Sequence, residues 1–199
     1  QHFDLGQVPA TPWKNGGGHT RELACWPPGA DMEGFEWRVS VATIAAPGPF
    51  SAFAGVDRQI MLLDGDGVHL GAPGAGLDHR LDRRWRPFAF PGDAAVDCRL
   101  LGGSSTDFNL MLRRGRWRGS VEVVRDARVP GSTPAGLCMV LAGRWRLGGD
   151  MLEPGQGLWW SAVGAGPALA PHALQGGEAP VLAWVGLMPF LQEKNASSA

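Results

Sequence analysis

The chain has 199 residues and a formal net charge of −1, with 18 basic and 19 acidic side chains. This balance argues against nucleic acid or anionic lipid as a partner, and no apolar stretch reaches the roughly 20 residues of a membrane helix. The 30 glycines and 16 prolines stand between short apolar runs, while 44% of the residues are hydrophobic. This punctuation predicts a folded all-β protein with little helix.

Residues 36–42 form the first clear strand, because apolar and polar side chains alternate along it. One face would carry Trp37, Val39 and Val41, and the other Arg38 and Ser40. More strands follow, closed by turns rich in Gly, Pro or Asp, over residues 58–63, 68–70, 88–93, 95–101 and 107–112.

The same succession of strand, glycine turn, strand and Pro-Gly turn occurs a second time. The second copy covers residues 137–142, 144–147, 152–157 and 180–187. We therefore predict two fused jelly-roll or β-barrel halves that pack as one unit, with residues 1–118 in the first half and residues 119–199 in the second.

The triplet Arg-Trp-Arg occurs three times, at residues 84–86, 116–118 and 144–146. On a strand, this pattern puts the indole in the core and both guanidinium groups in solvent. A protein-interaction or sugar-binding surface made from the nine tryptophans is an alternative function, and it requires several exposed indoles.

The three cysteines, Cys25, Cys98 and Cys138, are widely separated and never form a C-x-x-C pair. This argues against a disulfide scaffold or a zinc knuckle and for a reducing compartment. Since the first residues show no signal pattern, we expect a cytoplasmic protein.

The densest polar segment, residues 11–22, surrounds three consecutive glycines. Such glycines leave backbone N–H donors accessible to a ligand, although a flexible hairpin loop fits the composition equally well. The candidate ligand-binding residues of this segment are Trp13, Lys14, Asn15, Gly16, Gly17, Thr20, Arg21 and Glu22.

Two further segments offer polar side chains. Arg58 begins an apolar strand and is placed to project into a barrel mouth, although the sequence slightly favours a surface ion pair between Asp57 and Arg58. Asp107, Asn109 and Met111 share one strand face with Arg113, opposite Phe108, Leu110 and Leu112. That polar face points either to solvent or into a ligand cavity, and the sequence does not decide between the two.

Four motifs follow one another within residues 11–118: PWKNGGGHTRELA, WRVSVATIAAPGPFSAFAGVDRQIMLLDGDGVHL, FPGD and DFNLMLRRG. In this order they resemble the HutD/Ves family. The resemblance implies a bicupin fold of the cupin superfamily, in agreement with the two repeats. It also implies an accessory or regulatory protein that binds small molecules in connection with histidine utilisation.

Metal and catalytic residues are poorly represented. The histidines are His2, His19, His69, His79 and His172, with no H-x-H, and none follows Pro91-Gly92 or Pro154-Gly155 closely, so we expect no metal and no cofactor. His19 with Glu22, or His69, is a candidate acid–base group for a metal-independent isomerase or hydrolase, the alternative hypothesis.

The first hypothesis is a binding module for a small carboxylate of the urocanate or formylglutamate class. The guanidinium group of Arg58 or Arg21 would bind the carboxylate through two hydrogen bonds, beside Ser40, Asp107 and Asn109. Asn15 and the loop N–H groups would take the other polar end, and Trp13 would shield the site. A homodimer is reasonable because jelly rolls leave exposed sheet edges.

Overall fold

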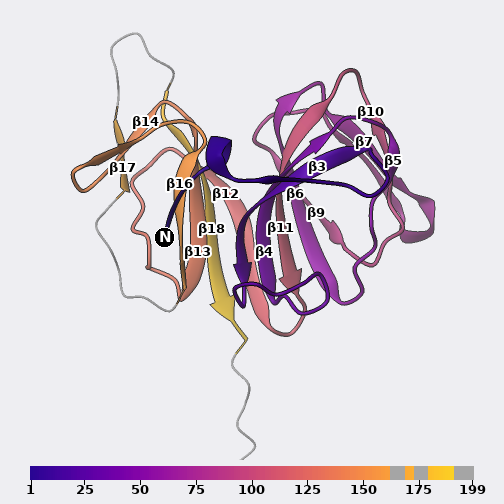
Figure 1. The fold of residues 1–199 in the computed structure, drawn as a ribbon, viewed down its shortest axis with the longest axis horizontal. Helices are drawn as coiled ribbons and strands as arrows, with labels where there is room; N and C mark the ends of the chain where they lie inside the picture. Colours follow the sequence, from indigo (N-terminus) through magenta and orange to yellow (C-terminus); the bar gives the residue numbers. More distant parts are fainter. Residues whose placement is uncertain (162–168, 173–178, 191–199) are drawn as a thin grey trace, which may run out of the picture.

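A computed structural model describes residues 1–161, 169–172 and 179–190 (Figure 1). Strands dominate these residues, with two three-residue 3₁₀ helices, η1 (Leu5–Gln7) and η2 (Pro73–Ala75), and no α-helix among them. The predicted all-β class is therefore confirmed. None of the helical segments in the described part of the chain has the length and apolarity to cross a membrane.

The first half consists of two facing sheets. The six-stranded sheet has the order β2-β3-β4-β11-β6-β9, with bounds Ala10–Pro12, Gly18–Trp26, Trp37–Ile44, Ser105–Arg113, Val56–Gly65 and Pro87–Pro91. The four-stranded sheet has the order β5-β10-β7-β8, with bounds Gly48–Pro49, Asp97–Leu100, Val68–Ala72 and Leu77–Leu81.

The second half repeats this arrangement with fewer strands. Its larger sheet has the order β1-β16-β13-β18-β12, with bounds His2–Asp4, Gln156–Ser161, Ala135–Ala142, Val181–Pro189 and Trp117–Val124. Its smaller sheet has the order β15-β14-β17, with bounds Asp150–Leu152, Arg144–Leu147 and Leu169–His172. The N-terminal strand β1 thus lies in the second half before the chain crosses to the first (Figure 1).

The three largest of the four apolar clusters among the described residues hold these sheets together. One fills the first half around Ile60 and Leu70, and one fills the second half around Trp145 and Leu182. A third joins the two larger sheets and contains the predicted apolar faces of β4 and β11, which are Trp37, Val39, Val41, Phe108, Leu110 and Leu112. Because strand side chains alternate, the opposite faces of β4 and β11 point into the first half.

The Arg-Trp-Arg triplets have three different surroundings. Trp145 lies buried on β14 as predicted, and Trp117 is half-buried on β12. Residues 84–86 lie on no strand and form a turn instead, with Trp85 at a φ of 61°. All nine tryptophans are buried or half-buried, so the exposed indoles that an interaction surface requires are missing from the described residues.

Candidate functional site

Four neighbouring strands of the six-stranded sheet bring polar side chains into the interior of the first half. The strand register places these polar side chains, together with the apolar Ala42, Ile60, Leu62 and Met111, in three successive rows: Thr20, Ala42, Asp107 and Leu62; then Glu22, Ser40, Asn109 and Ile60; then Cys25, Arg38, Met111 and Arg58. Neighbours within a row lie about 5 Å apart between strands. We call these three rows the interior cluster.

Arg58 is the central cation of the interior cluster. It is 8% exposed, and its Nη2 donates a hydrogen bond to Asn109 Oδ1 at 2.9 Å. The guanidinium carbon lies 5.3 Å, 5.7 Å and 5.1 Å from the ring centres of Phe50, Phe53 and Phe90. Its Nε has no partner, and no carboxylate among the described residues forms an ion pair with it. The slightly favoured Asp57–Arg58 surface pair is therefore wrong, and Asp57 pairs with Arg114 instead.

Arg58 has a lowered pKa because it is buried without a counter-ion among the described residues. Desolvation, and to a smaller extent the positive charge of Arg38, lowers the pKa of Arg58 to about 10. The group still carries its charge at neutral pH. A buried cation that lacks an anion is costly, so this site is electrostatically suited to an anionic ligand.

Asp107 lies two rows from Arg58 and is completely buried. Among the residues that the structure describes, neither of its carboxylate oxygens has a hydrogen-bond partner, and burial raises the pKa of this carboxyl group to about 7. Buried polar atoms in native proteins almost always have partners. The polar face of β11 thus points into the interior of the first half and not to solvent.

The other polar residues form the rim of the interior cluster. Arg38 Nε lies 2.6 Å from Glu22 Oε2, and Trp13 Nε1 donates to Thr20 Oγ1 at 2.8 Å. The Trp13 ring meets the edge of Phe50, with ring centres 6.5 Å apart. These contacts bring the start of the glycine segment next to the aromatic rings around Arg58.

The triple glycine shapes a tight turn between β2 and β3. Gly16 N–H donates to Trp13 O at 3.0 Å, and Gly17 N–H donates to Asn15 Oδ1 at 3.0 Å. Gly16 has a φ of +70°, and a Cβ on Gly18 would overlap the carbonyl oxygen of Thr43. This corrects the expectation that these N–H groups face a ligand, because they are already used within the turn, where Lys14 and Asn15 are exposed.

Three predicted residues lie apart from the interior cluster. Arg21 pairs with Val41 on the opposite face of its strand, and its Nη1 donates to Val8 O at 3.1 Å. The proposed grip by Arg21 is therefore wrong. His19 lies on the same opposite face, and His69 pairs with Asp78 on the outside of β7 and β8.

Arg38 and Phe90 are the site residues that the sequence reasoning missed. Arg38 alternates in phase with Ser40, which was enough to place it on the polar face of β4. Phe90 reaches Arg58 only through the pairing of β9 with β6, and such long-range pairing is not readable from the chain order.

The chemistry of the interior cluster does not fit a metal ion. Its two arginines would repel a cation, and its three rows contain no histidine. No group of three or more His, Cys, Asp or Glu side chains that could hold a metal gathers within the described ranges. The absence of a cofactor stays a prediction.

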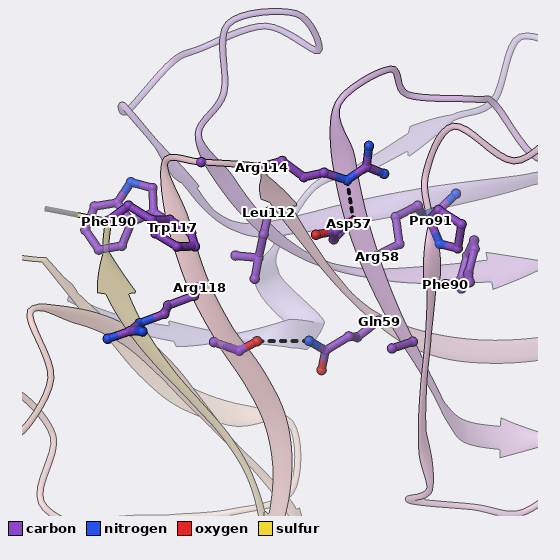
Figure 2. A pocket seen from close by; sticks show the side chains of 13 residues that line it. Asp57, Arg58, Gln59, Phe90, Pro91, Leu112, Arg114, Trp117, Arg118 and Phe190 are labelled. Atoms are coloured by element: carbon purple, nitrogen blue, oxygen red, sulfur yellow. Dashed lines mark hydrogen bonds and ion pairs between the residues drawn. The ribbon is translucent and has the colours of Figure 1, made fainter. Parts of the chain in front are cut away.

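A surface hollow of about 570 Å³ lies where the two halves meet, between β6, β9 and β12 (Figure 2). Gln59 bridges the halves there, because its Nε2 donates to Gly119 O at 3.0 Å and its Oε1 accepts from Val121 N–H at 2.9 Å. Arg114 closes one side through its bond to Asp57 Oδ1 at 2.6 Å. Gln59 thereby caps the free edge of β12 with a side-chain amide.

Replacement of Gln59 by leucine is expected to lower the free energy of unfolding by about 1–3 kcal/mol, because Gly119 O and Val121 N–H lose their partners. Urea denaturation measures this change. The control is Gln7→Leu, at an exposed position in η1, which should change the free energy by under about 0.5 kcal/mol. Equal stability of the two variants would show that the bridge contributes nothing.

Two β-barrel halves joined through their larger sheets give the chain a cupin fold. A cupin 2 conserved barrel domain protein from Leptotrichia buccalis covers 95% of this chain and 96% of its own length, at a TM-score of 0.57 and 7% identity, which is a likeness in fold alone.

Sequence comparison identifies the family of the chain. The HutD family model matches residues 6–178, and the chain belongs to this family. Protein Ves from Cronobacter sakazakii is 42% identical over 161 residues, which are 80% of this chain and 86% of that protein. HutD from Pseudomonas fluorescens SBW25 superimposes with a TM-score of 0.78 and 28% identity, covering 95% of this chain and 98% of its own.

Proposed function

We propose that this HutD-family protein is an accessory or regulatory protein linked to histidine utilisation. It binds a small carboxylate of the urocanate or formylglutamate class in its first barrel, without a metal. The observation that carries this proposal is Arg58, a buried cation that has neither a paired anion nor an acceptor for its Nε–H within residues 1–161, 169–172 and 179–190. A ligand carboxylate would supply both the missing charge and the missing acceptor.

Asp107 supports a ligand with a second polar end. Its unpartnered oxygens lie on the same face of β11 as Asn109, which holds Arg58. A carboxylate that also carries an N–H group would satisfy Arg58 and Asp107 together. Urocanate and formylglutamate both combine these groups, whereas formate has only the carboxylate. The structure of HutD from P. fluorescens is of a formate condition. Formate is therefore the smallest compound with which to test binding of a carboxylate alone.

The alternative is a metal-independent isomerase or hydrolase that acts on the same ligand class. Asp107 favours it, because a buried carboxyl group with a pKa of about 7 suits general acid–base catalysis near neutral pH. The two histidines considered for this role lie on other faces of their sheets.

The test is a thermal-shift screen with histidine, urocanate, formylglutamate, glutamate and formate, each with and without EDTA. Because a ligand of the folded state stabilises it by mass action, urocanate or formylglutamate should raise the unfolding midpoint equally in both conditions. Proton NMR of the recovered ligand separates the two functions, since an enzyme returns a changed molecule. No shift with any of the five compounds would contradict the proposal.

We also propose that the protein is cytoplasmic and can form a homodimer. Three free, buried cysteines suit the reducing cytoplasm. The outer strands β2 and β9 give a homodimer an edge to use.

A further inference from the structure

A second hollow, of about 560 Å³, lies at an open seam of the first barrel. Strands β8 and β9 are the last strands of their two sheets, and residues 82–86 connect them. The hollow is lined by residues 79–83 and 85–87. We call it the seam hollow. It is separate from the interior cluster, since the two share no residue.

Arginine dominates the seam hollow. Residues 80–86 contain four arginines and one aspartate, in a chain of net charge −1. Arg80 Nε lies 3.1 Å from Asp82 Oδ2, and Arg84 Nε donates to Leu63 O at 2.7 Å. The guanidinium groups of Arg83 and Arg86 are exposed and make no hydrogen bond or ion pair with any residue that the structure describes. Two guanidinium groups therefore lie at one concave site, and neither has a hydrogen-bond acceptor among the described residues.

The backbone of this segment is strained. Trp85 is the only residue other than glycine with a positive φ among the described residues, and its N–H donates to Leu62 O at 2.9 Å. A bulky side chain rarely adopts this conformation, and such strain persists where the surrounding structure imposes it, often at ligand sites. Here it turns the chain so that Arg83, Trp85 and Arg86 all line the same hollow.

Two aromatic side chains, His79 and Trp85, line the seam hollow. His79 of β8 stacks on Phe88 of β9, with ring centres 3.6 Å apart and planes 4° apart, and this stack spans the seam. Burial lowers the pKa of His79, so the imidazole is mainly neutral at pH 7 and contributes a flat surface and a hydrogen-bonding nitrogen rather than a charge.

We propose that the seam hollow binds a small organic phosphate, with the phosphate oxygens between Arg83 and Arg86 and a planar group against Trp85 and His79. A phosphate carries more than one negative charge and several acceptor oxygens, so it satisfies two forks, whereas a carboxylate matches one. The volume lies within the roughly 300–1,000 Å³ of small-molecule sites. The acidic balance of the whole chain favours a small anion over a nucleic acid.

The test is isothermal titration calorimetry of the full chain with inorganic pyrophosphate and with ADP. We expect both to bind, and the double variant Arg83→Ser/Arg86→Ser to weaken ADP binding at least tenfold. The matched control is Arg116→Ser/Arg146→Ser, which removes the same charge at exposed positions outside the hollow and should leave the affinity within twofold. The shift with urocanate or formylglutamate should be the same in both double variants.

Several results would overturn the proposal. No heat with either phosphate is one, and an equal loss of ADP affinity in the control variant, which indicates unspecific attraction, is another. If pyrophosphate bound and ADP did not, the hollow would not accept the organic part of the proposed ligand, and the proposal would be wrong in that part. Binding of an oligo-aspartate peptide without ADP binding would instead assign the hollow to an acidic protein segment.

Discussion

Replacing Arg58 with methionine is expected to abolish binding of the carboxylate and to stabilise the unliganded protein. The loss of affinity should be about 2–4 kcal/mol, roughly 30-fold to 1,000-fold, because the charged fork that pairs with the ligand is removed. The free energy of unfolding should rise by about 1–3 kcal/mol, since methionine fills a similar volume without a buried, uncompensated charge. The freed Asn109 Oδ1 offsets part of this gain.

Urea denaturation without ligand and calorimetric titration with urocanate or formylglutamate measure the two effects. Arg58→Lys is the first control, because it keeps the buried charge but loses the fork, and it should weaken binding without stabilising the fold. Arg125→Met is the second, at an exposed arginine outside both hollows, and it should change neither quantity. If Arg58→Met bound every candidate acid as well as the wild type, the carboxylate site would lie elsewhere.

Asp107→Asn is expected to remove one component of the pH dependence of stability. Burial raises the pKa of Asp107 to about 7 in the folded protein, whereas an unfolded aspartate titrates near its ordinary value of about 3.9. Between these values the folded state binds the extra proton, so this group's contribution falls by about 1.4 kcal/mol for each pH unit. The contribution is full below pH 4 and is lost by about pH 7, a total of about 4 kcal/mol.

The stability difference between Asp107→Asn and the wild type isolates this effect from the other carboxyl groups. The variant should be close to the wild type at pH 4 and more stable by about 2–4 kcal/mol at pH 8, because asparagine stays neutral. Urea denaturation at each pH unit measures the difference. Asp126→Asn, at an exposed carboxylate, is the control and should give a flat difference. A flat difference for Asp107→Asn as well would mean that water already satisfies its carboxylate in the folded protein.

Local pattern accounts for most of the fold that could be predicted. The alternation along β4 and β11 identified their apolar faces, because a strand buried on one side shows a period of two. It failed at residues 84–86, where the same Arg-Trp-Arg letters form a turn. There the backbone follows the tertiary contact of Trp85 N–H with Leu62 O, a contact that the triplet itself does not encode.

The candidate site was predictable in its residue types and less so in its arrangement. Alternation placed Asp107 and Asn109 on one face, but only the pairing of β11 with β6 brings Arg58 within hydrogen-bond distance of Asn109. The glycine segment was overrated as a source of ligand contacts, because glycine permits both an open anion site and a closed turn. Which one forms depends on the acceptors nearby, and here Trp13 O and Asn15 Oδ1 take the N–H groups.

The two unlike faces of β11 make this strand intolerant of insertions and deletions. A slip of one residue would bring Phe108 and Leu110 into the interior cluster and push Asp107 and Asn109 into the core between the halves. Burying polar side chains in the core and placing apolar ones in the interior cluster both cost stability. The sequence of β11 therefore fixes its own pairing register. Length variation among homologous chains should therefore collect in the exposed segment just before it, residues 102–104, and be missing from residues 105–113.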